Sequence, residues 1–174
     1  MPGNLYFSKK NKVKEKTLTI HFTEFDSPDD LSLAEQELIK SATKATDTSY
    51  APYSQFKVGA AVLLENGEII MGSNQENTAY PSGLCAERVA VFTAKANFPK
   101  LKIKAVAVTA KTKNFSVDTP ITPCGACRQV IAETEKRQQS KIKILMKGQK
   151  GPVLSVEGIE NLLPLMFHEE KLKK

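Results

Sequence analysis

Three cysteines could hold a metal ion in this sequence. Cys124 and Cys127 are three positions apart in the segment PCGAC (123–127), and Cys85 opens the separate segment CAER (85–88). At the start of a helix, cysteines with this spacing lie on one face, one turn apart, so both sulfurs can reach one ion. A helix N-terminus also stabilises a thiolate over a thiol. Together with Cys85, the pair predicts a metal site with three thiolate ligands.

The number of cysteines indicates what such a site would do. Structural zinc sites normally have four protein ligands, whereas catalytic sites keep one position for water. Glu87 is expected in the first helical turn after Cys85, where its carboxylate can face that water and exchange a proton with it. Three thiolates around Zn²⁺ leave a net negative charge, which Arg88 and the helix dipoles can offset. The pattern therefore predicts a catalytic zinc site.

Two other interpretations account for part of the cysteine pattern. A Cys-x-x-Cys pair can be redox-active, but that role leaves Cys85 unexplained. Buried structural cysteines are common, but three that each begin a helix fit that role poorly. His21 and His168 are the two histidines of the chain, and neither has partners at ligand spacing. A structural zinc or redox protein without turnover stays open as the alternative from another functional class.

Hydrophobic periodicity predicts the elements that position these residues. Asn66 and Gly67 form a strong hairpin signal between two apolar runs. The run 103–109 has the composition of a strand buried on both faces. Ser155 is expected to open a last helix that ends at Pro164. Helices are also predicted at 31–45, 84–96 and 124–137, and strands at 17–25, 57–64, 68–72, 103–109 and 142–146.

This order of elements predicts an α/β fold with three layers, α/β/α, around a mixed, roughly five-stranded sheet. Residues 17–168 are expected to form a single domain, preceded by a basic flexible extension (1–16) and followed by a charged tail (169–174). Residues 1–14 carry no weight in the fold prediction, because the letters NLYFS within them resemble the remnant of an expression-tag cleavage site.

Composition excludes several classes of protein. The 174 residues include 25 Lys and Arg against 19 Asp and Glu, a formal net charge of +6, and 41% are hydrophobic. Most of the excess positive charge lies in the extension and the tail, so the predicted domain is nearly neutral and lacks the basic face of a nucleic-acid binder. We find no apolar run near the roughly 18 residues of a membrane helix, and no apolar core of a signal peptide.

The cysteine segments resemble those of the free-nucleoside cytidine deaminases, which belong to the wider group of zinc deaminases. The resemblance runs from about Tyr50 to Phe167 and is highly specific as a set. Besides CAER and PCGACRQ, it includes PYSQFKVGAA (52–61), NQEN (74–77), AYP (79–81) and LLP (162–164). A three-layer deaminase fold is what this resemblance implies.

The resemblance implies a role for each matching residue. Zn²⁺, one per subunit, would be held by Cys85, Cys124 and Cys127, with Glu87 as the proton shuttle. The other implied contacts are those of Asn74 and Glu76 with a ribose hydroxyl, of Phe56 with the pyrimidine, and of the Ala86 backbone N–H with the base.

An all-cysteine ligand set resembles the homotetrameric branch of the family, in which subunits share active sites. Tyr80 and Phe167 would there help to complete a neighbour's pocket. The support for Phe167 is the weakest, because Leu165 and Met166 replace the small or polar residues that often precede it.

The implied activity is zinc-dependent hydrolytic deamination of cytidine and 2'-deoxycytidine to uridine and 2'-deoxyuridine, with release of ammonia, as in pyrimidine salvage. The implied protein is cytoplasmic, with a small-molecule substrate and neither nucleic acid nor membrane as partner. The alternative within the enzyme class is a deaminase of another small cytosine nucleoside, such as an aminoacylnucleoside antibiotic. Asn74, Glu76 and Arg88 favour the plain nucleoside.

Overall fold

The computed structural model describes residues 13–172 of the chain. Most of the predicted basic extension (residues 1–12) and the last two residues of the predicted tail lie outside the described residues. Within the described part, no helix is both long and apolar enough to cross a membrane.

A single mixed sheet of six strands organises the chain, in the order β1-β6-β5-β4-β2-β3. Strands β4 and β5 are parallel, and the other neighbouring pairs are antiparallel. The strands are β1 (Thr23–Phe25), β2 (Lys57–Leu64), β3 (Ile69–Ser73), β4 (Ile103–Lys111), β5 (Lys143–Lys147) and β6 (Val153–Glu157).

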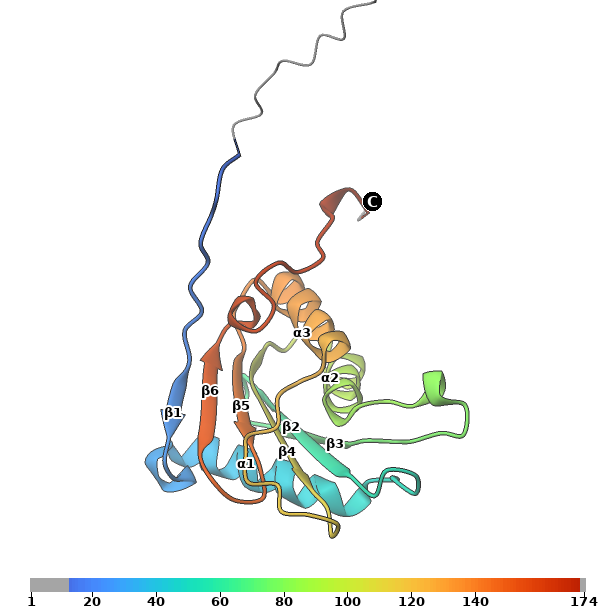
Figure 1. Ribbon diagram of the computed structural model, residues 1–174. Helices are drawn as coiled ribbons and strands as arrows, with labels where there is room; N and C mark the ends of the chain where they lie inside the picture. Colours follow the sequence, from blue (N-terminus) through green and yellow to red (C-terminus); the bar gives the residue numbers. More distant parts are fainter. Residues whose placement is uncertain (1–12, 173–174) are drawn as a thin grey trace, which may run out of the picture.

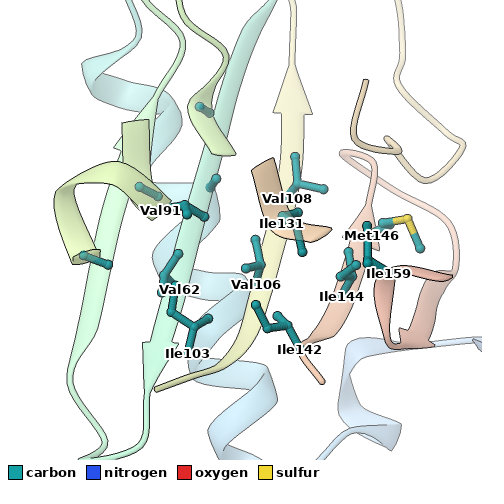
Figure 2. Close-up of a cluster of buried hydrophobic side chains, with 14 of the residues drawn as sticks. Val62, Val91, Ile103, Val106, Val108, Ile131, Ile142, Ile144, Met146 and Ile159 are labelled. Atoms are coloured by element: carbon teal, nitrogen blue, oxygen red, sulfur yellow. The ribbon is translucent and has the colours of Figure 1, made fainter. Parts of the chain in front are cut away.

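Helices cover both faces of the sheet, as Figure 1 shows. The helices are α1 (Leu33–Ala45), α2 (Ala86–Asn97) and α3 (Gly125–Gln138). Side chains alternate along β4: Val106 and Val108 pack with α2 and α3, whereas Ala105 and Ala107 pack with α1. The α2–α3 side holds the larger cluster of buried apolar side chains, part of which is drawn in Figure 2. The predicted three-layer α/β/α fold is therefore confirmed.

Glycines let two helices approach the sheet closely. A Cβ atom on Gly59 of β2 would lie 2.1 Å from the Ala42 carbonyl oxygen of α1. A Cβ on Gly72 of β3 would lie 2.5 Å from the Ala90 nitrogen and 2.7 Å from the Ala86 oxygen of α2. The contacting atoms are backbone atoms, so a larger residue would push the whole helix away from the sheet.

Most predicted elements appear with small changes at their ends, and the Asn66-Gly67 hairpin joins β2 to β3 with Gly67 at φ +88°. The predicted helix after Ser155 is wrong: residues 153–157 form β6, the sixth strand. Val153 and Val156 are β-branched and buried, and Gly158, at φ +87°, ends the strand before a short 3₁₀ turn. The predicted strand 17–25 is regular only at 23–25.

Candidate functional site

Two helix N-termini bring the three cysteines together. Cys85 is the N-cap residue of α2, and Cys124 is the N-cap residue of α3. The Cys85 sulfur lies 3.8 Å from that of Cys124, which lies 3.5 Å from that of Cys127. All three sulfurs lie within 4.8 Å of one another, so one ion can contact them all. The cysteines are free thiols, and Cys127 is buried.

The loop that carries Cys124 is fixed by an arginine one residue after Cys127. The Arg128 guanidinium donates hydrogen bonds to the carbonyl oxygen of Pro123 at 2.8 Å and to that of Leu162 at 2.6 Å. These bonds tie the start of α3 to the segment after β6. Arg128 therefore holds the Cys124 loop in place.

The surroundings of the cysteines favour a thiolate. Hydrogen bonds from Cys127, Arg88 and Cys124 lower the pKa of Cys85 to about 5, against the opposing effect of burial. The pKa of Cys127 is raised, because that thiol keeps its proton in the bond to Cys85 and is buried. The Arg88 guanidinium lies 3.8 Å from the Cys85 sulfur. This cluster carries negative charge next to a fixed cation.

Glu87 lies beside the sulfurs in the first turn of α2. Only 5% of its surface is exposed. Burial raises the pKa of its carboxyl, and the negative charge of Cys85 adds to that rise. The neighbouring Cys127 thiol partly opposes this rise in pKa. A buried carboxyl with a raised pKa next to a cavity is suited to accepting and returning protons near neutral pH.

The residues present fit a zinc ion. Three sulfurs that converge within 4.8 Å, with one pKa already lowered, form the soft thiolate donor set that zinc prefers. No fourth His, Cys, Asp or Glu joins this cluster among the described residues, so the protein supplies three ligands. A three-ligand set is that of a catalytic rather than a structural zinc site.

A cavity of about 700 Å³ opens above the cluster. Its lining combines the metal-site residues with polar side chains from the segment after β3, the 53–54 turn and the loop before α3. The residues lining it that sequence analysis had singled out are Asn74, Glu76, Tyr80, Cys85, Glu87, Arg88 and Cys124.

Asn74 and Glu76 follow β3 and hold the rim of the cavity in shape. The Asn74 side chain accepts a hydrogen bond from the Val58 N–H at 2.8 Å and donates one to the Phe56 carbonyl at 3.0 Å. One Glu76 carboxylate oxygen accepts a bond from the Tyr53 N–H at 2.9 Å, and the other accepts one from the Ser54 hydroxyl. Both residues therefore combine contact with the cavity and a structural role.

The predicted aromatic residues occupy three different places. Tyr80 is 80% exposed at the cavity mouth and packs edge-on against Tyr53, with ring centroids 6.3 Å apart. Phe56 stacks on Phe115 and is outside the cavity lining. Phe167 is 71% exposed and lines a separate hollow between α2, α3 and the C-terminal segment.

Ala86 is buried as the first residue of α2, where the backbone N–H has no partner within the helix. The sequence did not indicate that Tyr53, Ser54 and Thr122 line the cavity, or that Arg128 holds the loop. Tyr53 and Ser54 lie in the motif PYS, and Arg128 lies in PCGACRQ, whereas Thr122 lies in neither. The position of a residue in a motif does not show what that residue contacts.

Comparisons with known proteins agree with this geometry. Residues 33–142 match the family model described as the cytidine and deoxycytidylate deaminase zinc-binding region. The chain is 39% identical over 137 residues to a cytidine deaminase of Halalkalibacterium halodurans, covering 79% of this chain and 96% of the relative. It is 41% identical over 137 residues to one of Sporosarcina psychrophila, covering 79% and 93%.

Solved structures give the same result. The crystal structure of cytidine deaminase from Burkholderia pseudomallei matches with a TM-score of 0.64 and 37% identity, covering 75% of this chain and 97% of that one. The enzyme from Mycobacterium tuberculosis matches with a TM-score of 0.58 and 30% identity, covering 76% and 96%.

Proposed function

Because the chain belongs to the cytidine and deoxycytidylate deaminase family, we propose that it hydrolyses cytidine and 2'-deoxycytidine to uridine and 2'-deoxyuridine, releasing ammonia. The observation that carries the proposal is the convergence of three cysteine sulfurs and a buried glutamate at one cavity. The volume of this cavity, about 700 Å³, is within the usual range for small-molecule sites.

Cys85, Cys124 and Cys127 would hold one Zn²⁺ per chain. When bound, the ion would act as a Lewis acid that makes water a nucleophile at neutral pH. Arg88, 3.8 Å from the Cys85 sulfur, offsets the negative charge of the thiolates. Three thiolates alone would make the zinc ion a weak Lewis acid, so the positive charge of Arg88 supports a catalytic role.

The Glu87 carboxyl moves the protons of the reaction. It takes a proton from the attacking water and delivers it to N3 of the pyrimidine as oxygen bonds to C4. It then takes the proton of the new C4 hydroxyl and passes it to the 4-amino group, so that the C4–N bond breaks, ammonia leaves and a C4 carbonyl remains. The raised pKa of Glu87, caused by burial, supports both directions of transfer.

The rest of the cavity would bind the nucleoside. Asn74 and Glu76, on the rim, would hydrogen-bond a sugar hydroxyl, and the Ala86 N–H at the start of α2 would contact the base. Phe56 stacks on Phe115 outside the cavity lining, so its proposed packing near the pyrimidine ring rests on the family resemblance alone. Among the described residues, the cavity lining includes the carboxylates Glu76 and Glu87 and a single cation, Arg88. This charge balance suits a neutral nucleoside.

We further propose a cytoplasmic homotetramer with shared active sites, in which Tyr80 and Phe167 complete a neighbour's pocket. Tyr80 and Phe167 are strongly exposed in the single chain, although aromatic rings gain from burial. Three free thiols favour a reducing compartment. We also propose that residues 17–168 form a single domain, with a basic extension before it and a charged tail after it.

Substrate choice tests the proposal. We expect release of uridine and ammonia from cytidine and 2'-deoxycytidine, with kcat/KM at least about 100-fold lower for free cytosine, which lacks the sugar hydroxyls. An aminoacylnucleoside should be a poorer substrate than cytidine. Equal rates on cytosine and cytidine would contradict the sugar contacts, and no turnover of either nucleoside would contradict the proposed function.

A further inference from the structure

The segment before β1 has the sequence pattern of a strand, but it lacks a neighbouring strand over most of its length. Leu18, Ile20 and Phe22 alternate with polar residues, which is typical of a strand with one buried face. Their exposed fractions are nevertheless 61%, 52% and 60%. In Figure 1 this blue segment runs on from β1 and away from the body of the protein. Three large apolar side chains on one face of an extended chain indicate a missing partner.

One backbone edge of this segment is also open. β1 is an edge strand of the sheet, and within residues 13–172 it pairs with β6 alone. The His21 N–H points toward the β6 side, where it donates to the Asn161 side chain at 2.9 Å. Because N–H groups alternate along a strand, those of Ile20 and Phe22 point to the opposite edge. That edge can accept another strand.

We propose that residues 16–24 of two copies of this chain pair antiparallel about a two-fold axis through Ile20, joining their sheets edge to edge. In this register Ile20 faces Ile20 of the second copy, and Leu18 faces Phe22. Lys16 faces Glu24, so each end of the ladder has an ion pair. On the other face of the ladder, Thr17 is opposite Thr23. The segment is therefore complementary to itself.

Neighbouring registers lack this match. An axis through Thr19 places Lys16 opposite Phe22, and an axis through His21 places Leu18 opposite Glu24. In the single chain, Lys16 and Glu24 make no ion pair with any residue from 13 to 172. The segment also precedes residues 33–142, so the zinc-binding region gives no reason for its pattern. A second copy is the partner that this charge and apolar pattern fits.

Charge reversal tests the register directly. K16E places two glutamates opposite each other and E24K places two lysines, so each should raise the dissociation constant of the association at least about tenfold at low salt. The double variant K16E/E24K should restore it, as should an equimolar mixture of the two single variants. Failure of both restorations would overturn the proposed register.

Sedimentation velocity over a concentration series measures the association itself. The wild-type chain should reach at least twice the mass of the particle that I20K forms, because I20K places two lysines on the axis. L33K is the matched control, since Leu33 is equally apolar and 83% exposed on α1. Equal masses of wild type and I20K at all concentrations would overturn the proposal.

Amide hydrogen exchange distinguishes this association from the remaining alternative, in which the segment packs on the surface of its own chain. Protection of residues 17–22 should rise with protein concentration in the wild type and be lost in I20K. Protection independent of concentration would place the segment on its own chain and overturn the proposal. Cytidine turnover should be equal in I20K and wild type, because Ile20 is outside the cavity lining. The association and the proposed activity can thus fail separately.

Discussion

At the scale of single residues, Glu87 has the most specific task. It lies in the first turn of α2, is 95% shielded from solvent and contacts the Cys127 thiol. E87Q keeps the shape of the side chain but cannot carry a proton. We therefore expect kcat to fall about 10²- to 10⁴-fold while zinc content and thermal stability stay close to wild type.

The control for E87Q is E37Q, which makes the same change on the exposed face of α1 and should keep full activity. Ammonia release and zinc content would be measured on the same samples. Near-normal turnover in E87Q would remove Glu87 from the mechanism, and loss of zinc would make it a structural residue.

At the scale of elements, Gly72 sets how closely α2 approaches the sheet. In G72A the new Cβ would meet the backbone of Ala86 and Ala90, so α2 and the N-cap residue Cys85 must shift. We expect a loss of about 1–3 kcal/mol in the free energy of unfolding and a weaker affinity for zinc. G125A is the control for stability, because a Cβ there would meet no atom within 4 Å beyond its chain neighbours and its own helix backbone. A change below about 0.5 kcal/mol in urea unfolding of G72A would contradict this account.

Glu135 joins the end of α3 to the strands beside it. One carboxylate oxygen accepts the Ile142 N–H at 2.8 Å and the Ile159 N–H at 3.0 Å. Burial raises the pKa of Glu135, with a smaller contribution from Glu160, and the two N–H bonds and Lys141 oppose that rise. The folded state therefore binds this proton more tightly than the unfolded state does.

The consequence is a pH dependence with a definite sign. The contribution of Glu135 to stability should fall as pH rises from 4.5 through its raised pKa and then stay level. E135Q keeps the acceptor oxygen but cannot ionise. The stability of wild type relative to E135Q, from urea unfolding between pH 4.5 and 8, should decrease with pH. A constant difference would contradict the assignment.

Local signals explain which elements could be predicted. The Asn66-Gly67 hairpin and the Val- and Ala-rich run of β4 are signals carried by neighbours in sequence, and both were predicted correctly. β6 was missed because Ser155 resembles a helix cap, while burial of Val153 and Val156 between β1 and β5 decides the outcome. The pairing of β6 with β1 and β5 joins segments distant in sequence, so it cannot be predicted from the periodicity of one segment.

In the candidate site too, local spacing could be interpreted from the sequence, whereas long-range contacts could not. Its cysteines and Glu87 were singled out by their spacing, because helix geometry fixes where such residues point, and the structure brings the three sulfurs together. The hydrogen bonds of Asn74 to Val58 and of Arg128 to Leu162 join segments distant in sequence. Only the folded chain shows that these residues hold the rim and the metal loop.

At the scale of the whole molecule, shared sites predict complementation between inactive chains. E87Q lacks the proton shuttle, and F167A lacks the aromatic ring proposed to reach a neighbour's pocket. In mixed tetramers, about a quarter of the sites would combine Glu87 from one chain with Phe167 from another. We expect co-expressed variants to be more active than the sum of the two separate variants. Activity equal to that sum would contradict site sharing.

The proposed activity depends on three thiolates that hold one catalytic zinc ion. Its most direct test is to titrate zinc into the metal-free chain while following both bound metal and ammonia release from cytidine. We predict that activity rises in proportion to bound zinc and stops rising at one equivalent per chain, and that C124S binds and gains almost none. Full turnover without zinc, or one bound zinc per chain without turnover, would contradict the account.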